Sequence, residues 1–259
     1  MLGWTVIEAF NGKMEVDGVT HEFDLNKPQT MKSIRSIVAM NALIHLGAKV
    51  GWNGETIQDL ATPNIESTSE LAKIAHEKDA KIIFASAAVV YGSKTTLISS
   101  DSPLNPDTPY AESKLEGERI IIKNSSNHCI LRLCGLWGER GPAHLMLNRA
   151  INGALDGVTP TIYGSGKAKR NYLYVMDAAE IVIDSLHEQK QGTYIVGGEE
   201  RLTIFEMLQK VCQVFLPGEV PKHVEHEEAR DQIIESTYTI LNKMTFYDTL
   251  ISIKKGLSH

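Results

Sequence analysis

Two side chains at the start of a predicted helix have the types and spacing of an acid–base pair. Tyr110 and Lys114 are four residues apart in the segment PYAESKLEGERIIIK, residues 109–123. This spacing places both side chains on one face of a helix. A neighbouring ammonium favours the ionised phenol and lowers its pKa, so such a tyrosine can exchange protons near neutral pH. A solvated lysine beside a half-buried tyrosine is the alternative interpretation of an isolated pair.

The elements that must position this pair form an alternating pattern of strands and helices. Fully apolar strands that alternate with helices are typical of a parallel sheet covered on both faces, so we expect an α/β, doubly wound fold. We also expect Pro63 to break the helical stretch before residue 78, and Thr203 and Glu206 to form a capping box. The predicted strands are residues 5–10, 21–25, 42–48, 81–87, 129–138 and 193–198, and helices are predicted after Lys27, over residues 65–77 and 109–123, and after Tyr174 and Phe205.

Composition and charge exclude several classes of protein. The 259 residues carry a net charge of −6 with no basic stripe, so we expect no nucleic-acid partner. The apolar runs are too short for a membrane span, and the N-terminus lacks the pattern of a signal peptide. The three cysteines, Cys129, Cys134 and Cys212, show no CxxC spacing, which indicates reduced, buried thiols and a cytoplasmic location.

The histidines and Cys134 are interpreted as surface or core residues and not as functional ones. His223 and His226 lie close together in sequence but have no third ligand near them, so we expect no metal site. His45 lies in an apolar strand and is interpreted as a core histidine with a hydrogen-bond partner. Cys134 is interpreted as core packing.

Four segments carry a family resemblance. SAAVVYG (residues 86–92), the Tyr110/Lys114 segment, LRLCGLWGERG (131–141) and YGSGKAKRNYLYVMDAAE (163–180) occur in an order that resembles the extended short-chain dehydrogenase/reductase family. These NAD-dependent epimerases, dehydratases and reductases modify nucleotide-sugars. The resemblance covers nearly the whole chain, from Gly3 to Leu257.

The resemblance implies an architecture. Residues 1–138 plus 171–198 would form a Rossmann-like dinucleotide-binding domain. Residues 139–170 plus 199–259 would form a smaller, mostly helical substrate-binding region. The family often pairs through the helix that carries the tyrosine and lysine, so a homodimer is expected.

The resemblance also implies site residues. Tyr110 would be the catalytic acid/base and Lys114 would bond the nicotinamide ribose, with Ser86 as the candidate catalytic hydroxyl. NAD or NADP would be contacted by Asp24, Leu25, Gly47, Ala48, Asn64, Ala85, Tyr110 and Lys114. The nucleotide-sugar would be contacted by Ala87, Tyr91, Arg170 and Arg230. The two arginines would bind its diphosphate, because guanidinium groups suit a diphosphate. Solvated surface positions are the alternatives for Asp24, Arg170 and Arg230.

Three departures from the family pattern affect the expected activity. The family begins with a Gly-rich turn that holds the cofactor pyrophosphate, whereas MLGWTVIEAF matches the end of that first helix and the second strand. Phe10 stands where the family has the acid that binds the adenosine ribose, so NAD and NADP both stay open. Ala87 stands where the family has a serine or threonine. Ser86 precedes it and faces the opposite side of the strand unless a bulge re-aims it.

Three functional interpretations stay open. The first is an NAD(P)-dependent enzyme that oxidises and reduces a sugar carbon of a nucleotide-sugar. The second is a catalytically impaired relative that binds a nucleotide-sugar or regulates a partner protein. The third is an incomplete sequence of an active enzyme. We expect cofactor binding to be weakened by the absent Gly-rich turn.

Overall fold

The computed structural model describes the protein from Lys27 onward with short gaps. The described residues are 27–51, 53–138, 141, 142, 144–239 and 244–256, together with Leu2, Thr5, Val6 and Leu25. Asp24, Phe10 and most of the two strands expected before residue 26 therefore lie outside the described residues. Thr5 and Val6 are helical, so the expected strand over residues 5–10 is wrong at its start.

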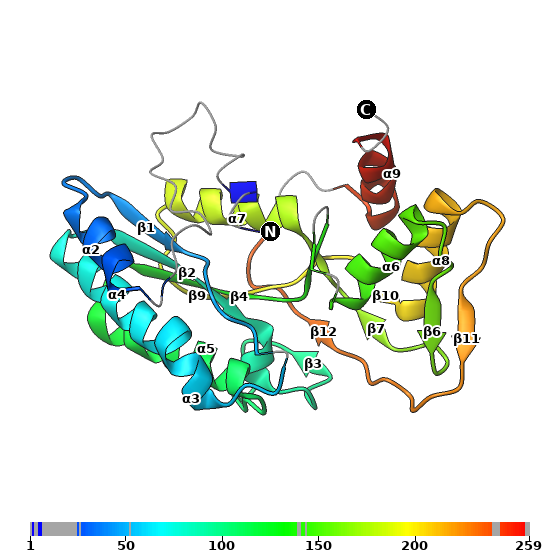
Figure 1. Ribbon diagram of the computed structural model, residues 1–259, viewed down its shortest axis with the longest axis horizontal. Helices are drawn as coiled ribbons and strands as arrows, with labels where there is room; N and C mark the ends of the chain where they lie inside the picture. The colour runs from blue at the N-terminus through cyan, green and yellow to red at the C-terminus, as the bar shows by residue number, and fades with distance from the viewer. Residues whose placement is uncertain are drawn as a thin grey trace.

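A parallel sheet forms the centre of the molecule (Figure 1). Its described strands follow the order β1-β2-β4-β9, and the register is continuous, with Ala87 of β2 opposite Leu133 of β4 and Leu133 opposite Val196 of β9. All three pairings are parallel, which confirms the expected sheet type. The strands are β1 (Ala42–His45), β2 (Lys81–Ala87), β4 (His128–Leu133) and β9 (Gly192–Val196).

Helices cover both faces of this sheet. Figure 1 shows α2, α4 and α5 on one side and α7 on the other. Ile82 and Phe84 of β2 join the cluster with α2, α4 and α5, whereas Ile83 and Ala85 join the cluster with α7, as the alternation of a strand requires. The fold is therefore doubly wound, as expected. The helices are α2 (Pro28–Ser36), α3 (Ile57–Leu60), α4 (Ser67–Glu77), α5 (Pro109–Asn124) and α7 (Val175–His187).

The expectation that Pro63 breaks the helix is wrong. A π-helical segment, η1 (Ala61–Glu66), joins α3 directly to α4, and Pro63 lies buried inside it. Proline has no backbone N–H, but the wider turn accommodates the ring without ending the helix. The Ser67 hydroxyl donates to the Pro63 carbonyl at 2.5 Å, which gives that oxygen a partner inside the helix.

The second region combines three packed helices with short strand pairs (Figure 1). α6 (Met146–Leu155), α8 (Ile204–Phe215) and α9 (Phe246–Gly256) share one apolar cluster. The predicted capping box opens α8, because Thr203 and Glu206 each bond the other's backbone N–H. The remaining elements are η2 (Ala88–Tyr91), β3 (Leu97–Ile98), β5 (Leu136–Trp137), β6 (Thr161–Tyr163), β7 (Lys169–Arg170), β8 (Leu173–Tyr174), β10 (Leu202–Thr203), β11 (Lys222–Val224) and β12 (Ile233–Ile234).

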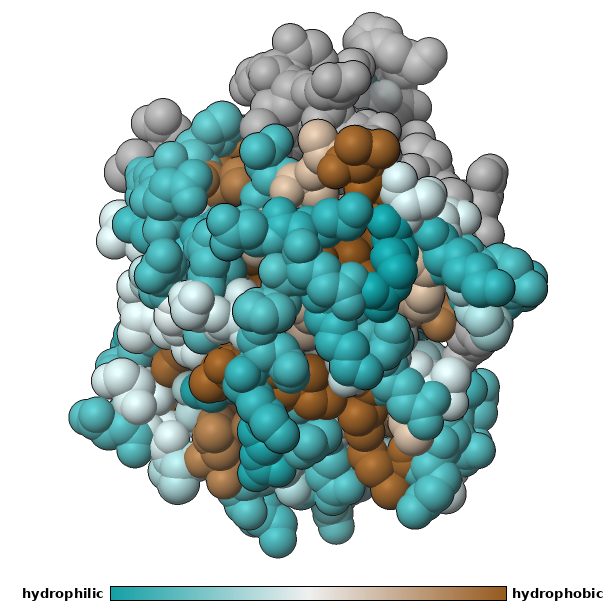
Figure 2. Space-filling model, turned by 90° about the vertical axis from the view of Figure 1, so that its left-hand side faces the viewer, coloured by the Kyte–Doolittle hydropathy of each residue, from teal (hydrophilic) through white to brown (hydrophobic). Residues whose placement is uncertain are grey.

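One strand pair crosses the expected boundary between the two regions. β12 belongs to the expected substrate-binding region but pairs in parallel with β3 of the dinucleotide-binding domain. The division at residues 138, 170 and 198 stays a prediction. The side of the molecule that faces the viewer in Figure 2 is covered mostly by hydrophilic residues, with apolar residues between them.

Candidate active site

The carboxyl ends of the parallel strands bring the expected site segments to one edge of the sheet. Leu46 follows β1, Ala88 follows β2, Cys134 follows β4 and Gly197 follows β9. Ligands bind beyond this edge in open α/β sheets. Candidate residues at this edge are therefore placed to contact a ligand.

Tyr110 and Lys114 lie on the face of α5 that packs on β2. Pro109 occupies the first turn of this helix, and the Thr108 side chain caps it by accepting from the Ala111 N–H at 3.2 Å. The Lys114 ammonium donates to the carbonyl of Ala85 at 2.7 Å and lies 5.9 Å from the centre of the Tyr110 ring. The helix therefore holds the expected acid–base pair against the end of β2.

Burial dominates the ionisation of both groups. Desolvation lowers the pKa of Lys114 to about 8, and the nearby Glu118 carboxylate opposes that shift. Desolvation raises the pKa of Tyr110 to about 12. The expected lowering of the Tyr110 pKa is thus not found, because burial of the phenol outweighs the neighbouring ammonium. Near neutral pH Tyr110 is a protonated phenol.

Ser86 faces α5 and is committed to Glu118. The β2–β4 register runs without a bulge through Ser86 and Ala87, so their side chains lie on opposite faces. Ser86 is buried, and its hydroxyl donates to Glu118 Oε1 at 2.5 Å. Ala87 is half-buried and contributes no hydroxyl on the other face.

Arg132 completes a partly buried network that the sequence motifs did not predict. Its Nη2 donates to Glu118 Oε2 at 2.7 Å, and its Nη1 donates to the Tyr91 hydroxyl at 2.7 Å. Tyr91 is only 1% exposed, so its expected contact with substrate stays a prediction. The signal for this network was the four-residue step from Lys114 to Glu118, which continues the spacing of Tyr110 and Lys114.

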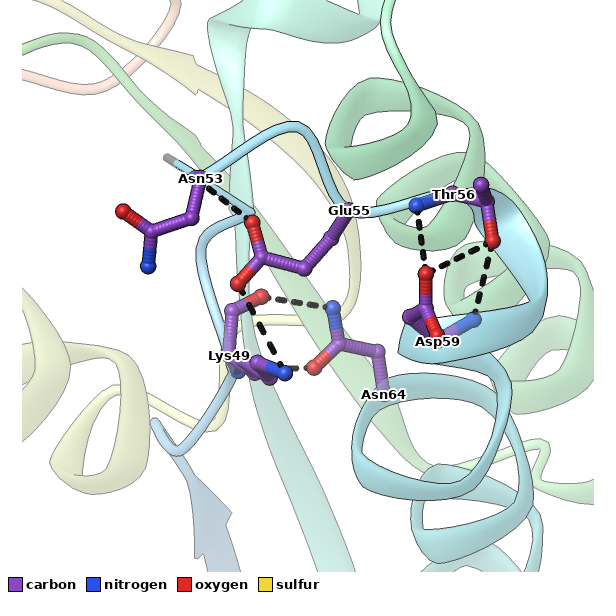
Figure 3. A network of polar contacts seen from close by, with 6 residues as sticks. All are labelled: Lys49, Asn53, Glu55, Thr56, Asp59 and Asn64. Carbon is purple, nitrogen blue, oxygen red and sulfur yellow. Dashed lines mark hydrogen bonds and ion pairs between the residues drawn. The ribbon is translucent and has the colours of Figure 1, made fainter.

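Asn64 fixes the segment that follows β1 (Figure 3). Its side-chain amide bonds both the N–H and the carbonyl of Lys49, each at 2.8 Å, and also donates to the Ser113 hydroxyl at 2.9 Å. Asn64 is 4% exposed. The expected cofactor residue therefore ties the backbone next to Ala48 to helix α5.

Figure 3 shows further contacts within the segment between β1 and α3. The Lys49 ammonium lies 3.6 Å from Glu55 Oε1, and Glu55 Oε2 accepts from the Asn53 N–H at 2.7 Å. Thr56 and Asp59 then form the capping box that begins α3. The chain is thus held by side chains from the end of β1 to the next helix.

Gly47 and Leu25, two expected cofactor residues, are neighbours in space. A Cβ added at Gly47 would lie 3.1 Å from Leu25 Cδ1. The sequence separates them by more than twenty residues. The structure therefore brings together Leu25 and Gly47, while Asp24 lies outside the described residues.

The two expected diphosphate arginines also meet. Arg170 Nη1 donates to the backbone carbonyl of Arg230 at 2.6 Å and to the carbonyl of Lys169 at 2.8 Å. The backbone of Gln232 bridges to Arg170 in the same place. The segment EARDQ thus lies alongside β7, although 60 residues separate the two arginines.

His45, His223 and Cys134 make contacts within the fold. His45 Nε2 lies 2.8 Å from the Thr68 hydroxyl, and burial lowers the pKa of His45 to about 3. His223 stacks on Phe205, with 6.0 Å between ring centres. Across the described residues no three metal-ligating side chains gather. Cys134 is buried and directs its Sγ to the carbonyl of Asn171.

A pocket beyond β9 lies away from Tyr110. It has a volume of about 200 Å³, and its lining includes Trp137, Tyr172, Tyr174, Glu199 and Phe246 but neither Tyr110 nor Lys114. The lining also includes the acidic residues Asp177 and Glu200, but it lacks the tyrosine and lysine pair of α5. In the described parts of the chain, no helix is long and apolar enough to cross a membrane.

Comparison with known proteins identifies the family and the fold. A UDP-N-acetyl-alpha-D-glucosaminuronate decarboxylase of Bacillus cytotoxicus is 28% identical over 242 residues, covering 84% of this chain and 74% of that protein. The crystal structure of UDP-N-acetylglucosamine 4-epimerase from Bacillus cereus superposes with a TM-score of 0.82 at 22% identity, covering 100% of this chain and 96% of that one.

A second solved structure was determined with a dinucleotide. UDP-glucuronic acid 4-epimerase from Bacillus cereus, in complex with NAD, has a TM-score of 0.74 at 22% identity, covering 88% of this chain and 76% of that one. At this identity the two structures establish the fold. The model of the NAD dependent epimerase/dehydratase family matches residues 4–197, about three quarters of the sequence. The chain therefore belongs to the NAD dependent epimerase/dehydratase family.

Proposed function

We propose that this protein is an NAD(P)-dependent enzyme that modifies the sugar of a nucleotide-sugar by epimerisation, dehydration or reduction. The observation that carries the proposal is the Tyr110/Lys114 pair at the end of β2, with Lys114 anchored on the Ala85 carbonyl at 2.7 Å. Family membership supports the reaction class. The substrates in the names of the matched relatives support a nucleotide-sugar.

The residues at the sheet edge fit a dinucleotide. Small residues lie at or near the ends of the strands at Gly47, Ala48, Ala85 and Ala87, and such residues would suit the close approach of a flat ring and a phosphate chain to the backbone. The Asn64 contacts keep this edge in one conformation. When bound, NAD or NADP supplies hydride acceptance and donation next to the pair.

Tyr110 moves the proton in this proposal. Its raised pKa, about 12, makes it a phenol that donates to a sugar oxygen at neutral pH. The reverse transfer, from a sugar hydroxyl, needs a phenolate, and the Lys114 ammonium beside the ring stabilises that charge. Ala87 contributes no second hydroxyl from β2, so Tyr110 of α5 orients the reacting oxygen without a hydroxyl from that strand.

The arginine pair would hold the nucleotide diphosphate. Arg170 and Arg230 come from distant segments, and their contact fixes the Arg230 backbone beside β7. Guanidinium groups bind diphosphates with paired hydrogen bonds. We assign Ala87 and Tyr91 to the sugar side of the same substrate.

The hydrogen bond from Ser86 to Glu118 favours a second candidate function, a catalytically impaired relative that binds a nucleotide-sugar.

We also propose a cytoplasmic homodimer. The buried free thiols support the cytoplasmic location, and the family resemblance supports the dimer. Light scattering after size exclusion tests the dimer, and a monomer at micromolar concentration would contradict it.

Calorimetric titration with NAD, NADP, UDP and dTDP separates the candidates. Micromolar binding of a dinucleotide, followed by conversion of UDP- or dTDP-sugars detected by NMR, would support the enzyme. Binding of UDP or dTDP without conversion would support the impaired relative. No binding of any dinucleotide would refute the enzyme proposal.

A further inference from the structure

Helix α5 presents three polar side chains in a row toward β2. Tyr110, Lys114 and Glu118 follow at four-residue steps, which places them on one helix face. Lys114 is 3% exposed and Glu118 is 1% exposed. A Cβ at Gly117 would lie 2.9 Å from Phe84 Cζ, so the helix packs closely on the strand here. The proposed function uses the first two side chains and leaves Glu118 without a role.

Glu118 is held by two residues of neighbouring strands. Its Oε1 accepts from the Ser86 hydroxyl at 2.5 Å and from Arg132 Nε at 3.0 Å. Its Oε2 accepts from Arg132 Nη2 at 2.7 Å. Ser86 and Arg132 are register partners across β2 and β4. The carboxylate therefore has one position, with both oxygens bonded.

The charges that face Lys114 come from several elements. His45 of β1 is neutral because burial lowers its pKa to about 3, and Tyr110 is neutral because burial raises its pKa to about 12. Arg132 of β4 is cationic and forms an ion pair with Glu118, with 2.7 Å between Nη2 and Oε2. Among these described neighbours, Glu118 is the carboxylate, and its charge opposes the loss of the Lys114 proton.

We propose that Glu118 is a positioning residue for the acid–base pair: held by Ser86 and Arg132, it locks α5 onto the end of β2 and places its carboxylate about one helical turn from Lys114. This inference rests on the proposed function of Tyr110 and Lys114. It also explains Ser86, whose hydroxyl serves Glu118 and is therefore a support for the pair instead of a direct participant.

The test is the protonation midpoint of Lys114, followed by NMR in protein with lysine labelled with ¹³C at Cε. A Lys114→Arg variant assigns the signal. In Glu118→Gln the midpoint is expected to fall by about one pH unit, because a close opposite charge is lost. Glu116→Gln is the matched control, since Glu116 lies on the same helix and pairs with the exposed Arg119. An unchanged midpoint in Glu118→Gln overturns the proposal.

A double variant covers the case in which Glu118→Gln does not fold. Glu118→Gln with Arg132→Met removes both buried charges, so neither is left without a partner. The Lys114 midpoint is expected to stay below that of the unmodified protein. A return to the original midpoint would mean that Glu118 only pairs with Arg132, and would refute the proposal.

Turnover gives a second readout. If the unmodified protein converts a nucleotide-sugar, Glu118→Gln is expected to lower kcat about fivefold at pH 8, since a midpoint that falls from about 8 by about one pH unit reduces the ammonium form from about half to about a tenth of the molecules. KM is expected to change less than about twofold. If the unmodified protein has no turnover, the proposed function fails, while the NMR midpoint still decides the role of Glu118.

Discussion

The Lys114 ammonium donates a 2.7 Å hydrogen bond to the carbonyl of Ala85, the residue directly before Ser86. This contact joins the helix of the acid–base pair to the end of the central strand. Because the bond uses a backbone acceptor, it survives substitution of the side chains on β2. The site can therefore be changed at Ala87, which lies on the other face of β2 from Ser86, without removing the acceptor of Lys114.

Tyr110→Phe is expected to abolish turnover while the protein stays folded. Removal of the only acid/base of the pair lowers kcat by about 10²- to 10⁴-fold, the range of general acid–base catalysis. Tyr163→Phe is the control, because Tyr163 is exposed on β6. Activity assays with circular dichroism check the result, and turnover within a few-fold of the original would remove Tyr110 from the proposed role.

Ala87→Ser is expected to raise turnover about tenfold. Residue 87 is where the family resemblance places a serine or threonine, and its side chain lies on the opposite side of β2 from Ser86, whose hydroxyl is bonded to Glu118. A hydroxyl at this half-buried position would add a second hydrogen-bond donor for the reacting oxygen. Steady-state kinetics checks this, with Ala88→Ser as the neighbouring control. Equal rates for Ala87→Ser and the original protein would contradict it.

Acid should unfold the protein partly through His45. The folded pKa is about 3 and the ordinary value is 6.5, so between these pH values the unfolded chain binds the proton and the folded chain does not. Stability is therefore lost as the pH falls from 6.5 towards 3, by at most about 5 kcal/mol from this group.

Urea unfolding at pH 7, 5 and 4 measures this loss. His45→Asn is expected to make stability less dependent on pH over this range, because an amide does not titrate. His76→Asn is the control, since His76 lies exposed on α4. An equal acid slope in His45→Asn and the original protein would assign the acid sensitivity to other groups.

Asn64→Ala is expected to weaken dinucleotide binding and to lower stability. The change leaves the N–H and carbonyl of Lys49 without their partner, at a cost of about 1–3 kcal/mol. Asn53→Ala is the matched control, because Asn53 contributes its backbone N–H to this network (Figure 3). Calorimetry with NAD and thermal unfolding measure both effects. Unchanged NAD affinity in a folded Asn64→Ala protein would argue against a cofactor role for this loop.

The sequence alone predicted the parts of the fold that depend on local patterns. These parts depend only on residues that are close together in the sequence. They include the apolar runs of β2 and β4, the proline that begins α5 and the capping box of α8. The Tyr110/Lys114 pair was predictable for the same reason, since both side chains lie on one helix.

Long-range contacts could not be predicted in this way. Glu118 was visible on the helix, but its partners Ser86 and Arg132 depend on the order of the strands. The direction of the shift in the Tyr110 pKa also depended on the tertiary structure, because the effect of burial outweighed that of the neighbouring ammonium. Pro63 continued a helix because tertiary packing favoured a π-helical turn that local rules do not anticipate.

The contact between Arg170 and Arg230 has a consequence for biosynthesis. The two residues are 60 positions apart, and β12 next to them pairs with β3 from the first half of the chain. Contacts of such high sequence separation form late, after the loops between them close. During translation β1, β2, α5 and β4 leave the ribosome about 100 residues before Arg230 does, and β9 follows later. The acid–base pair can therefore be assembled on a nascent chain that still lacks its proposed diphosphate clamp.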